Sequence, residues 1–431
     1  MNKIFEDKSL VVVFAYASAG LGHLRVTDAL YHGLPENLSP LLLRTQDQSV
    51  SFFHRLTSIS LIGRFIGEAM QKGILERIIT KIYSAQLRST SDILYKQMLT
   101  ILDQRISVPK KLLVIATHFG LAHQLAAVKQ KLEQKYGIKV YLVVQVTDDS
   151  PQRMWDVKGA DLIVVPSRKT KRLLKSKALK AVSPYPINPS FAFGLEKFKS
   201  ENKAAQVGKG NSKIHICIPV SGAAVGLNYI KNLITALHES EKRYYFHIVA
   251  RQNLYTKTFL EWAEKQDYIQ ALSSIQDREV VNLYEQVYLN NIISLEITKP
   301  SEQCFKAILD PTRVGGSVLL LTHPVGRQEY DNLDFLYRHK LIPNKLERDL
   351  LWESNINEKL ASKAKHWRGL RLPDNPKKAA DFILWCKEQS LFLQMMQFSR
   401  PVYKWQKNAY EVRSDGVSLF WKKVATLITR A

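Results

Sequence analysis

The chain has 431 residues, a length that suits two domains of ordinary size, each able to bury its own core. Its three cysteines, Cys217, Cys304 and Cys386, lie far apart without metal-ligand spacing, which argues against a disulfide framework and a zinc site. We expect no signal peptide, because Glu6 and Asp7 precede the first apolar run. We also expect no membrane span, because no uncharged apolar stretch reaches about 18 residues. The formal charge of +23 favours a polyanionic partner, namely an anionic membrane, a nucleic acid or a phosphorylated ligand.

The first half of the chain alternates short apolar runs with segments of helical periodicity. The predicted strands cover 10–16, 41–44, 111–117, 138–146 and 161–166, and the predicted helices cover 23–34 and 121–136 and resume at 169. Short apolar strands separated by helices predict a parallel sheet that is covered on both faces. Between 52 and 106 no strand pattern occurs, so this part is interpreted as a helical insert.

A second run of the same kind follows a proline-rich crossover, SPYPINPSF at 183–191, and a polar linker. Its predicted strands cover 214–220, 245–250, 292–297 and 318–322, and its predicted helices cover 228–238 and begin near 301 and again after 323–332. The predicted fold class is therefore α/β, with two doubly wound Rossmann-like domains facing across a cleft.

We assign domain boundaries from these patterns. Residues 1–195 form the N-terminal domain with its helical insert at about 51–106, and 196–212 form the linker. Residues 213–395 form the C-terminal domain, and 396–431 form terminal helices that can pack back on the first domain.

The loops after the strands hold the informative residues, because ligands of open parallel sheets bind beyond the carboxyl ends of the strands. In SAGLGH, Gly20 and Gly22 permit a tight turn, and the amides that open the next helix favour an anion; the alternative is a plain packing turn. The absence of Gly-Lys-Ser/Thr excludes a P-loop. NAD is weakly supported, because the third glycine of its fingerprint is missing although Asp47 lies roughly where the ribose acid falls. A second such joint is VSGAAVG, at 220–226.

Six motifs, in order along the chain, resemble those of the two-lobed GT-B glycosyltransferases. They are similar to the branch that contains monogalactosyldiacylglycerol synthases, processive diacylglycerol glucosyltransferases and the lipid II synthase. The motifs are SAGLGHLRVTDAL (18–30), VTDDSPQRMWDVKGADLIVVPS (146–167), YPINPSF (185–191), VARQN (249–253), TKPSEQCFKAIL (298–309) and HPVGRQEYDN (323–332).

The chain departs from that family's pattern at several positions. Ser301 stands where the family has a glycine. The position of the ribose-binding glutamate falls on Lys306 or Ala307, with Glu302 close but out of register. The histidine common between Thr-Asp and Trp is absent, and Arg327 is an insertion before Gln328.

The resemblance implies an inverting, metal-independent transfer of a sugar from a nucleotide-diphosphate sugar, with a UDP-sugar as the expected donor, to a lipid or lipid-linked acceptor. No cofactor is implied. Asp148 is preferred as the base for the incoming hydroxyl, and His23 either takes that role or orients the donor. The acceptor-side loop would include Gly20, Gly22 and Trp155. The donor-binding residues would be Ser221, Gly222, Gly226, Arg251, Lys299, Ser301, Glu302, Gln328, Glu329 and Asn332, which offer amides, cations and polar groups to a sugar diphosphate.

Three basic segments favour an anionic membrane as partner. They are 167–180, with seven cations and no acid on an expected helix, the mixed apolar and basic segment 52–87, and the amphipathic C-terminus at 417–431. The alternative for each is a solvated face over a core-packing stripe. We expect a cytoplasmic protein, peripheral on the inner face of the membrane.

Two other functions stay open at this point. One is a sugar-nucleotide epimerase, which needs no acceptor. The other is a GT-B-fold protein that binds a nucleotide or a membrane without transferase activity. Nucleic acid is disfavoured, because the aromatic-basic interleaving of known modules is absent.

Overall fold

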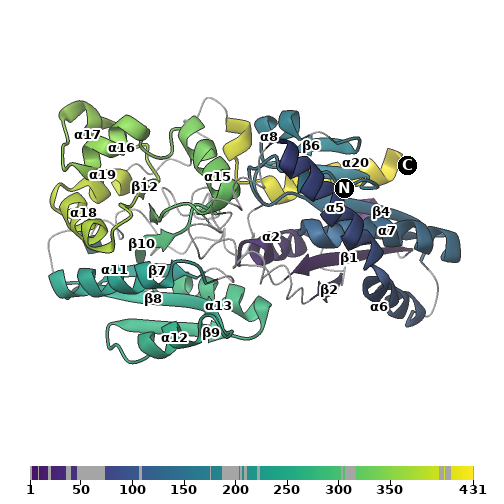
Figure 1. The fold of residues 1–431 in the computed structure, drawn as a ribbon, viewed down its shortest axis with the longest axis horizontal. Helices are drawn as coiled ribbons and strands as arrows, with labels where there is room; N and C mark the ends of the chain where they lie inside the picture. The colour runs from purple at the N-terminus through teal and green to yellow at the C-terminus, as the bar shows by residue number, and fades with distance from the viewer. Residues whose placement is uncertain are drawn as a thin grey trace. The chain divides into compact units, whose positions relative to one another are not determined.

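Two six-stranded sheets, paired in parallel throughout, form the framework of the computed structural model (Figure 1). The chain divides into one unit built mainly from His23–Pro189 with both chain ends, and another built mainly from Ser190–Ser414. The predicted α/β class with two doubly wound, Rossmann-like domains is confirmed. The structure describes residues 2–7, 9–17, 21–34, 40–45, 73–105, 109–174, 176–186, 203, 206–207, 211–220, 224–301, 304–305, 317–397, 402 and 409–430.

The first sheet has the order β2-β1-β3-β4-β5-β6. Its strands are β1 (Leu10–Ala17), β2 (Leu41–Thr45), β3 (Lys111–Ala116), β4 (Lys139–Gln145), β5 (Leu162–Val165) and β6 (Leu179–Val182). The central strands are continuous apolar runs because both of their faces are buried. The chain order reverses between β1 and β3, so the switch point at which such sheets bind ligands lies beyond the carboxyl ends of these two strands.

The helices of this unit are α1 (Asn2–Phe5), α2 (Leu21–His32), α5 (Gly73–Ser89), α6 (Asp92–Asp103), α7 (Phe119–Tyr136), α8 (Arg168–Leu173) and α20 (Gly416–Arg430), with a short 3-10 helix, η1, at Arg153–Trp155. The part of the predicted insert that the structure describes is helical, formed by α5 and α6. Its remainder, together with Asp47, lies outside the described residues. In the described part of the chain, no helix is long and apolar enough to cross a bilayer.

The expected helix over 167–180 is wrong in its second half. The helix α8 ends at Leu173, and Leu179–Val182 forms β6, the edge strand of the sheet, in parallel register with β5. Buried Leu174 takes an extended conformation and turns the chain toward the sheet edge. The four residues of β6 pair only with β5, and the Lys- and Arg-rich sequence around them shows no alternation that would indicate a strand. The sequence therefore did not predict β6.

The terminal helix α20 packs its apolar face onto the first unit. Trp421 is buried, donates from Nε1 to the carbonyl of Leu30 at 3.0 Å, and meets the Phe5 ring edge-on with centroids 5.4 Å apart. At the start of the helix, Ser183 Oγ donates to the carbonyl of Gly416 at 3.0 Å. The amphipathic pattern of this segment thus belongs to the protein core and does not provide a free apolar face for lipid.

The second sheet has the order β12-β11-β10-β7-β8-β9. Its strands are β7 (Ile214–Pro219), β8 (Tyr244–Arg251), β9 (Ile269–Ser274), β10 (Ile293–Thr298), β11 (Val318–Leu321) and β12 (Gly369–Arg371). The accompanying helices are α11 (Leu227–Ser240), α12 (Lys257–Ala263), α13 (Asp277–Asn290), α15 (Gly326–Arg338), α16 (Lys345–Trp352), α17 (Glu358–Ala364), α18 (Pro376–Glu388), α19 (Leu391–Gln397) and the 3-10 helix η4 (Ala409–Val412). A single apolar cluster joins this sheet to α11, α18 and α19.

A row of polar side chains crosses one face of the second sheet. His215 Nδ1 and His247 Nε2 lie 2.8 Å apart, and His247 Nδ1 lies 2.8 Å from Gln270 Oε1. This pattern suits two neutral rings, with Nδ1–H of His247 donating to Gln270 and Nε2 accepting from His215. Burial, opposed by the Gln270 bond, lowers the pKa of His247 to about 4, and burial also lowers the pKa of His215.

This row predicts an acid-sensitive stability. Because the folded pKa of His247 lies below the unfolded value, the unfolded chain binds more protons as the pH falls. The stability held at neutral pH is therefore lost between about pH 6.5 and pH 4, by about 3 kcal/mol. Urea unfolding at several pH values should show a shallower pH slope for His247→Gln than for the wild type. Equal slopes in the two proteins would contradict this prediction.

Candidate active site

His23 stands at the switch point of the first sheet, in the first turn of α2. Its Nδ1 lies 3.0 Å from the carbonyl oxygen of Thr117, directly after β3, and 3.3 Å from Thr147 Oγ1, beyond β4. Since a carbonyl oxygen only accepts, Nδ1 carries the proton and Nε2 keeps its lone pair. The arrangement thus presents a neutral imidazole with a free accepting nitrogen.

Hydroxyl groups fix α2 to the end of β3. Thr27 Oγ1 donates to the backbone carbonyl of His23 at 2.9 Å. Thr117 Oγ1 lies 2.7 Å from Thr27 Oγ1, so it donates to that oxygen in turn. Both threonines are buried, which protects this chain of bonds from water. The end of β3 therefore helps to set the position of the His23 ring.

The charge state of His23 is set by two opposing effects. Burial lowers the pKa of His23, and the negative charge of Asp148 and the carbonyl of Thr117 oppose that shift. Asp148 is 2% exposed and follows β4. A neutral histidine beside a buried carboxylate is suited to accept a proton, because the carboxylate stabilises the imidazolium that forms.

A second histidine, His118, packs beside His23. Their ring centroids lie 5.6 Å apart in an edge-on arrangement, and His118 stacks on Phe119 at 4.6 Å. Burial, with a contribution from His23, lowers the pKa of His118 to about 3, so this ring is neutral. A Cβ at Gly120 would lie 3.0 Å from Cε1 of His118, so glycine leaves the room that the ring requires.

The two adjacent aspartates after β4 have separate surroundings. Asp149 is fully buried and accepts hydrogen bonds from the hydroxyls of Ser167 and Thr170, the second at 2.8 Å. Ser167 Oγ in turn accepts from the backbone N–H of Thr170 and caps α8. Asp149 therefore supports the start of α8, whereas Asp148 contributes charge to His23.

We predict that Asp149→Ala lowers the free energy of unfolding by about 3 kcal/mol, because it removes the carboxyl group that accepts from two buried hydroxyls and leaves both O–H donors without an acceptor. Chemical denaturation measures this change. The matched control is Asp92→Ala, which removes an exposed carboxylate 3.3 Å from Lys131 and should cost less than about 0.5 kcal/mol. An Asp149→Ala protein as stable as the wild type would contradict the assignment.

The remaining acceptor-side predictions fall on backbone and core. Trp155 lies in η1 and is fully buried, with its ring edge-on to Phe119 at a centroid distance of 5.8 Å. Gly22 is buried in the first turn of α2, and Gly20 lies outside the described residues. The side chain of Trp155 thus supports Phe119 and, through it, His118.

In the second unit, four predicted donor residues gather at the carboxyl end of β10. Lys299 Nζ lies 2.8 Å from Glu329 Oε1, and both side chains are largely buried. Glu329 Oε2 accepts from the backbone N–H of Val325 at 2.7 Å, which closes the first turn of α15. Asn332 is buried and donates from Nδ2 to the carbonyl of Pro300 at 3.2 Å, next to Ser301.

The other donor predictions are more dispersed. Arg251, at the end of β8, forms an ion pair of 3.0 Å with buried Asp277 at the start of α13. Gly226 has φ of 87° and precedes α11, a conformation that favours glycine. Gln328 is half-buried on the first turn of α15. Ser221, Gly222 and Glu302 lie outside the described residues.

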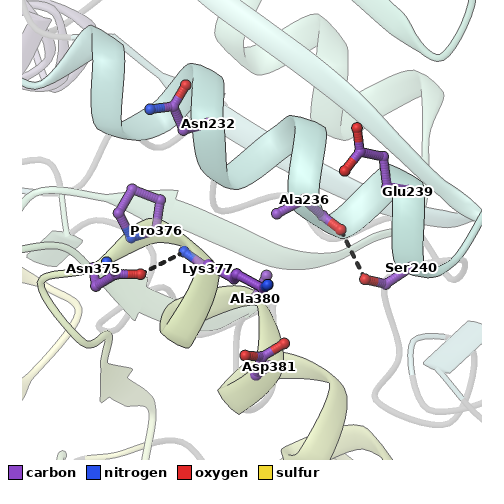
Figure 2. A pocket seen from close by; sticks show the side chains of 9 residues that line it. All are labelled: Asn232, Ala236, Glu239, Ser240, Asn375, Pro376, Lys377, Ala380 and Asp381. Atoms are coloured by element: carbon purple, nitrogen blue, oxygen red, sulfur yellow. Dashed lines mark hydrogen bonds between the residues drawn. The ribbon is translucent and has the colours of Figure 1, made fainter.

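A separate pocket of about 410 Å³ lies between α11 and α18 (Figure 2). Asn232 and Glu239 line it from α11, and Lys377 and Asp381 line it from α18. None of the predicted site residues lines it. Its two acids and single lysine do not form a site for a diphosphate, and no group of three or more His, Cys, Asp or Glu in the described residues is arranged to hold a metal ion.

Sequence reasoning missed Thr117, His118 and Thr147. Thr117 is the last residue of a predicted strand, and His118 and Thr147 each follow a predicted strand directly, so the rule that places ligands at strand ends would have found them. Their contact with His23 depends on the order of the strands, which periodicity does not contain.

Comparisons with known proteins give structural likenesses only. No protein-family model matches the chain, and no curated protein matches its sequence. A UDP-GlcNAc 2-epimerase from Neisseria meningitidis, bound to UDP-GlcNAc, is 11% identical with a TM-score of 0.49 over 97% of this chain and 99% of that chain. A UDP-glucosyltransferase from Polygonum tinctorium is 13% identical with a TM-score of 0.46 over 96% and 98%. A glycosyltransferase from Rickettsia africae is 12% identical with a TM-score of 0.46 over 98% and 100%.

Proposed function

We propose that the protein is a glycosyltransferase of the GT-B type, which moves a sugar from a nucleotide-diphosphate sugar, most simply a UDP-sugar, to the hydroxyl of a lipid or lipid-linked acceptor. The observation that carries the proposal is the neutral His23, held by Thr117 at the switch point with the buried charge of Asp148 beside it. This pair lies within two of the motifs that resemble those of the glycosyltransferases, in the stretches SAGLGH and VTDDS.

The proposed reaction is a direct displacement. The acceptor oxygen forms a bond to the anomeric carbon of the sugar as the bond from that carbon to the diphosphate breaks, and the nucleoside diphosphate leaves with the electron pair. The hydroxyl proton passes to Nε2 of His23, and Asp148 stabilises the resulting imidazolium. This division of roles favours His23 over Asp148 as the base, because the Thr117 carbonyl orients the partly exposed His23 ring, whereas Asp148 is only 2% exposed.

The donor is assigned to the second unit. Lys299 and Arg251 supply positive charge, and the amides of 221–226 supply hydrogen-bond donors for the diphosphate, so that no metal is required. Gln328 offers a half-exposed amide to the sugar hydroxyls. Glu329 and Asn332 already bond Lys299, Val325 and Pro300, so their main contribution is to position Lys299 and the turn around Ser301.

The proposed domain boundaries are 1–195 for the acceptor side, 196–212 for the linker, 213–395 for the donor side and 396–431 for the terminal segment. The proposed setting is the inner face of an anionic membrane, supported by the charge of +23. A lipid acceptor suits this setting because the enzyme must reach a substrate that stays in the bilayer.

The test is incubation of purified protein with UDP-glucose, UDP-galactose and UDP-N-acetylglucosamine, with and without detergent-solubilised diacylglycerol or a prenyl-linked sugar. Release of UDP with formation of a glycosylated lipid supports the proposal. Conversion of one UDP-sugar into another without acceptor would identify an epimerase instead. Thermal stabilisation by UDP without turnover would identify a nucleotide-binding protein that lacks transferase activity.

A further inference from the structure

The segment from Ser167 to Lys180 carries seven Lys and Arg residues and no acid. It includes α8 and the start of the edge strand β6 in the first unit (Figure 1). None of the seven cations belongs to the candidate active site, so the charge of this segment needs a separate explanation.

Buried side chains and strand pairing anchor the segment to the first sheet. Thr170 and Leu174 are buried beneath α8. Lys180 Nζ donates to the carbonyl of Leu174 at 2.7 Å, and β6 pairs with β5 from Leu162 and Leu179 onward. The backbone of α8 and β6 is therefore attached to the sheet, and the side chains that these contacts do not use face away from it.

Those outward side chains combine charge with bare aliphatic surface. Lys171, Arg172 and Lys177 are exposed, and none has a carboxylate partner among the described residues. On the two sides of the turn, Leu173 is 45% exposed and Leu179 is 56% exposed. We call these five residues the basic patch.

We propose that the basic patch docks the protein on an anionic lipid surface, with the cations against headgroup phosphates and the two leucines inserted at the boundary with the acyl chains. Cations near such a surface each contribute about 1 kcal/mol, and exposed aliphatic side chains gain by leaving water. A nucleic acid would use the charge but leave both leucines exposed, because it stacks on aromatic side chains, which the patch lacks. The inference rests on the proposed function in that a lipid acceptor requires such an attachment.

The experiment is co-sedimentation of the full chain with vesicles of phosphatidylcholine alone or with about a third of phosphatidylglycerol. Lys171→Glu with Arg172→Glu removes charge, and Leu173→Ser with Leu179→Ser removes the aliphatic contact. The matched control is Lys422→Glu with Lys423→Glu on α20, in the same unit and with the same change in net charge. Circular dichroism and transfer of sugar to a short-chain acceptor in detergent are recorded for every variant.

We expect wild type and control to bind anionic vesicles, and both patch variants to bind them at least about tenfold more weakly. All variants should retain the wild-type circular dichroism spectrum and the wild-type rate of sugar transfer in detergent. Equal binding by patch variants and wild type, or equal loss in the control, would overturn the proposal, since binding would then follow net charge alone. Patch-dependent retention on duplex DNA in place of vesicles would also overturn it. Patch-dependent vesicle binding without any sugar transfer would support the patch and refute the proposed function.

Discussion

Replacing His23 with alanine is expected to lower kcat for sugar transfer by about 10²- to 10⁴-fold, because the acceptor hydroxyl then loses its base. The substitution truncates a partly exposed side chain, and the bonds between Thr27, Thr117 and the backbone of residue 23 stay in place. Initial rates with saturating UDP-sugar and acceptor measure the effect, and a circular dichroism melt verifies the fold.

A matched control lies on the same helix. His32 is exposed and lies 3.4 Å from Asp28, so His32→Ala makes the same chemical change away from the switch point. We expect His32→Ala to retain wild-type kcat. If His23→Ala were equally active, the first unit would have to use another base, and Asp148 would be the remaining candidate.

Asp148→Asn is expected to lower kcat by about 10²- to 10⁴-fold as well, with a change in pH dependence that His23→Ala cannot show. Burial lowers the pKa of His23, and the charge of Asp148 opposes that shift. Without this charge the pKa falls further, so the acid limb of the kcat profile, where activity is lost by protonation of His23, should move to lower pH. A pH–rate profile from about pH 4 to 8 measures the shift.

The neighbouring acid separates charge from structure. Asp149→Asn should weaken the hydrogen bonds to Ser167 and Thr170 and reduce stability, but leave the position of the acid limb unchanged. If Asp148→Asn lowers kcat strongly but the acid limb of its remaining activity stays at the wild-type pH, Asp148 itself takes the proton and His23 has the orienting role.

Buried central strands could be predicted from the sequence, whereas some edge strands could not. β1, β3 and β4 are buried strands made almost entirely of apolar residues, which periodicity finds readily. The edge strands are different. β9 carries Gln270 and two serines, and β12 has three residues, so both depend on pairing with a neighbour that local sequence does not encode.

The sequence indicated individual candidate residues, but it did not predict which of their side chains are in contact. The motifs indicated His23 and Asp148, and the positions of the loops indicated the carboxyl ends of the strands in each sheet. The bonds from Thr117 and Thr147 to His23 span 94 and 124 residues and follow from strand order alone. The ion pairs of Lys299 with Glu329 and of Arg251 with Asp277 likewise join elements whose adjacency is a tertiary property.

The return of α20 to the first unit has a consequence for biosynthesis. Trp421 fills a space beside Phe5 and Phe14, at the opposite end of the chain. Domains commonly fold in the order in which they leave the ribosome, but this one stays incomplete until the second unit has been translated. Until α20 has been synthesised, the rings of Phe5 and Phe14 lack the edge-on contact with Trp421 that they have in the folded protein.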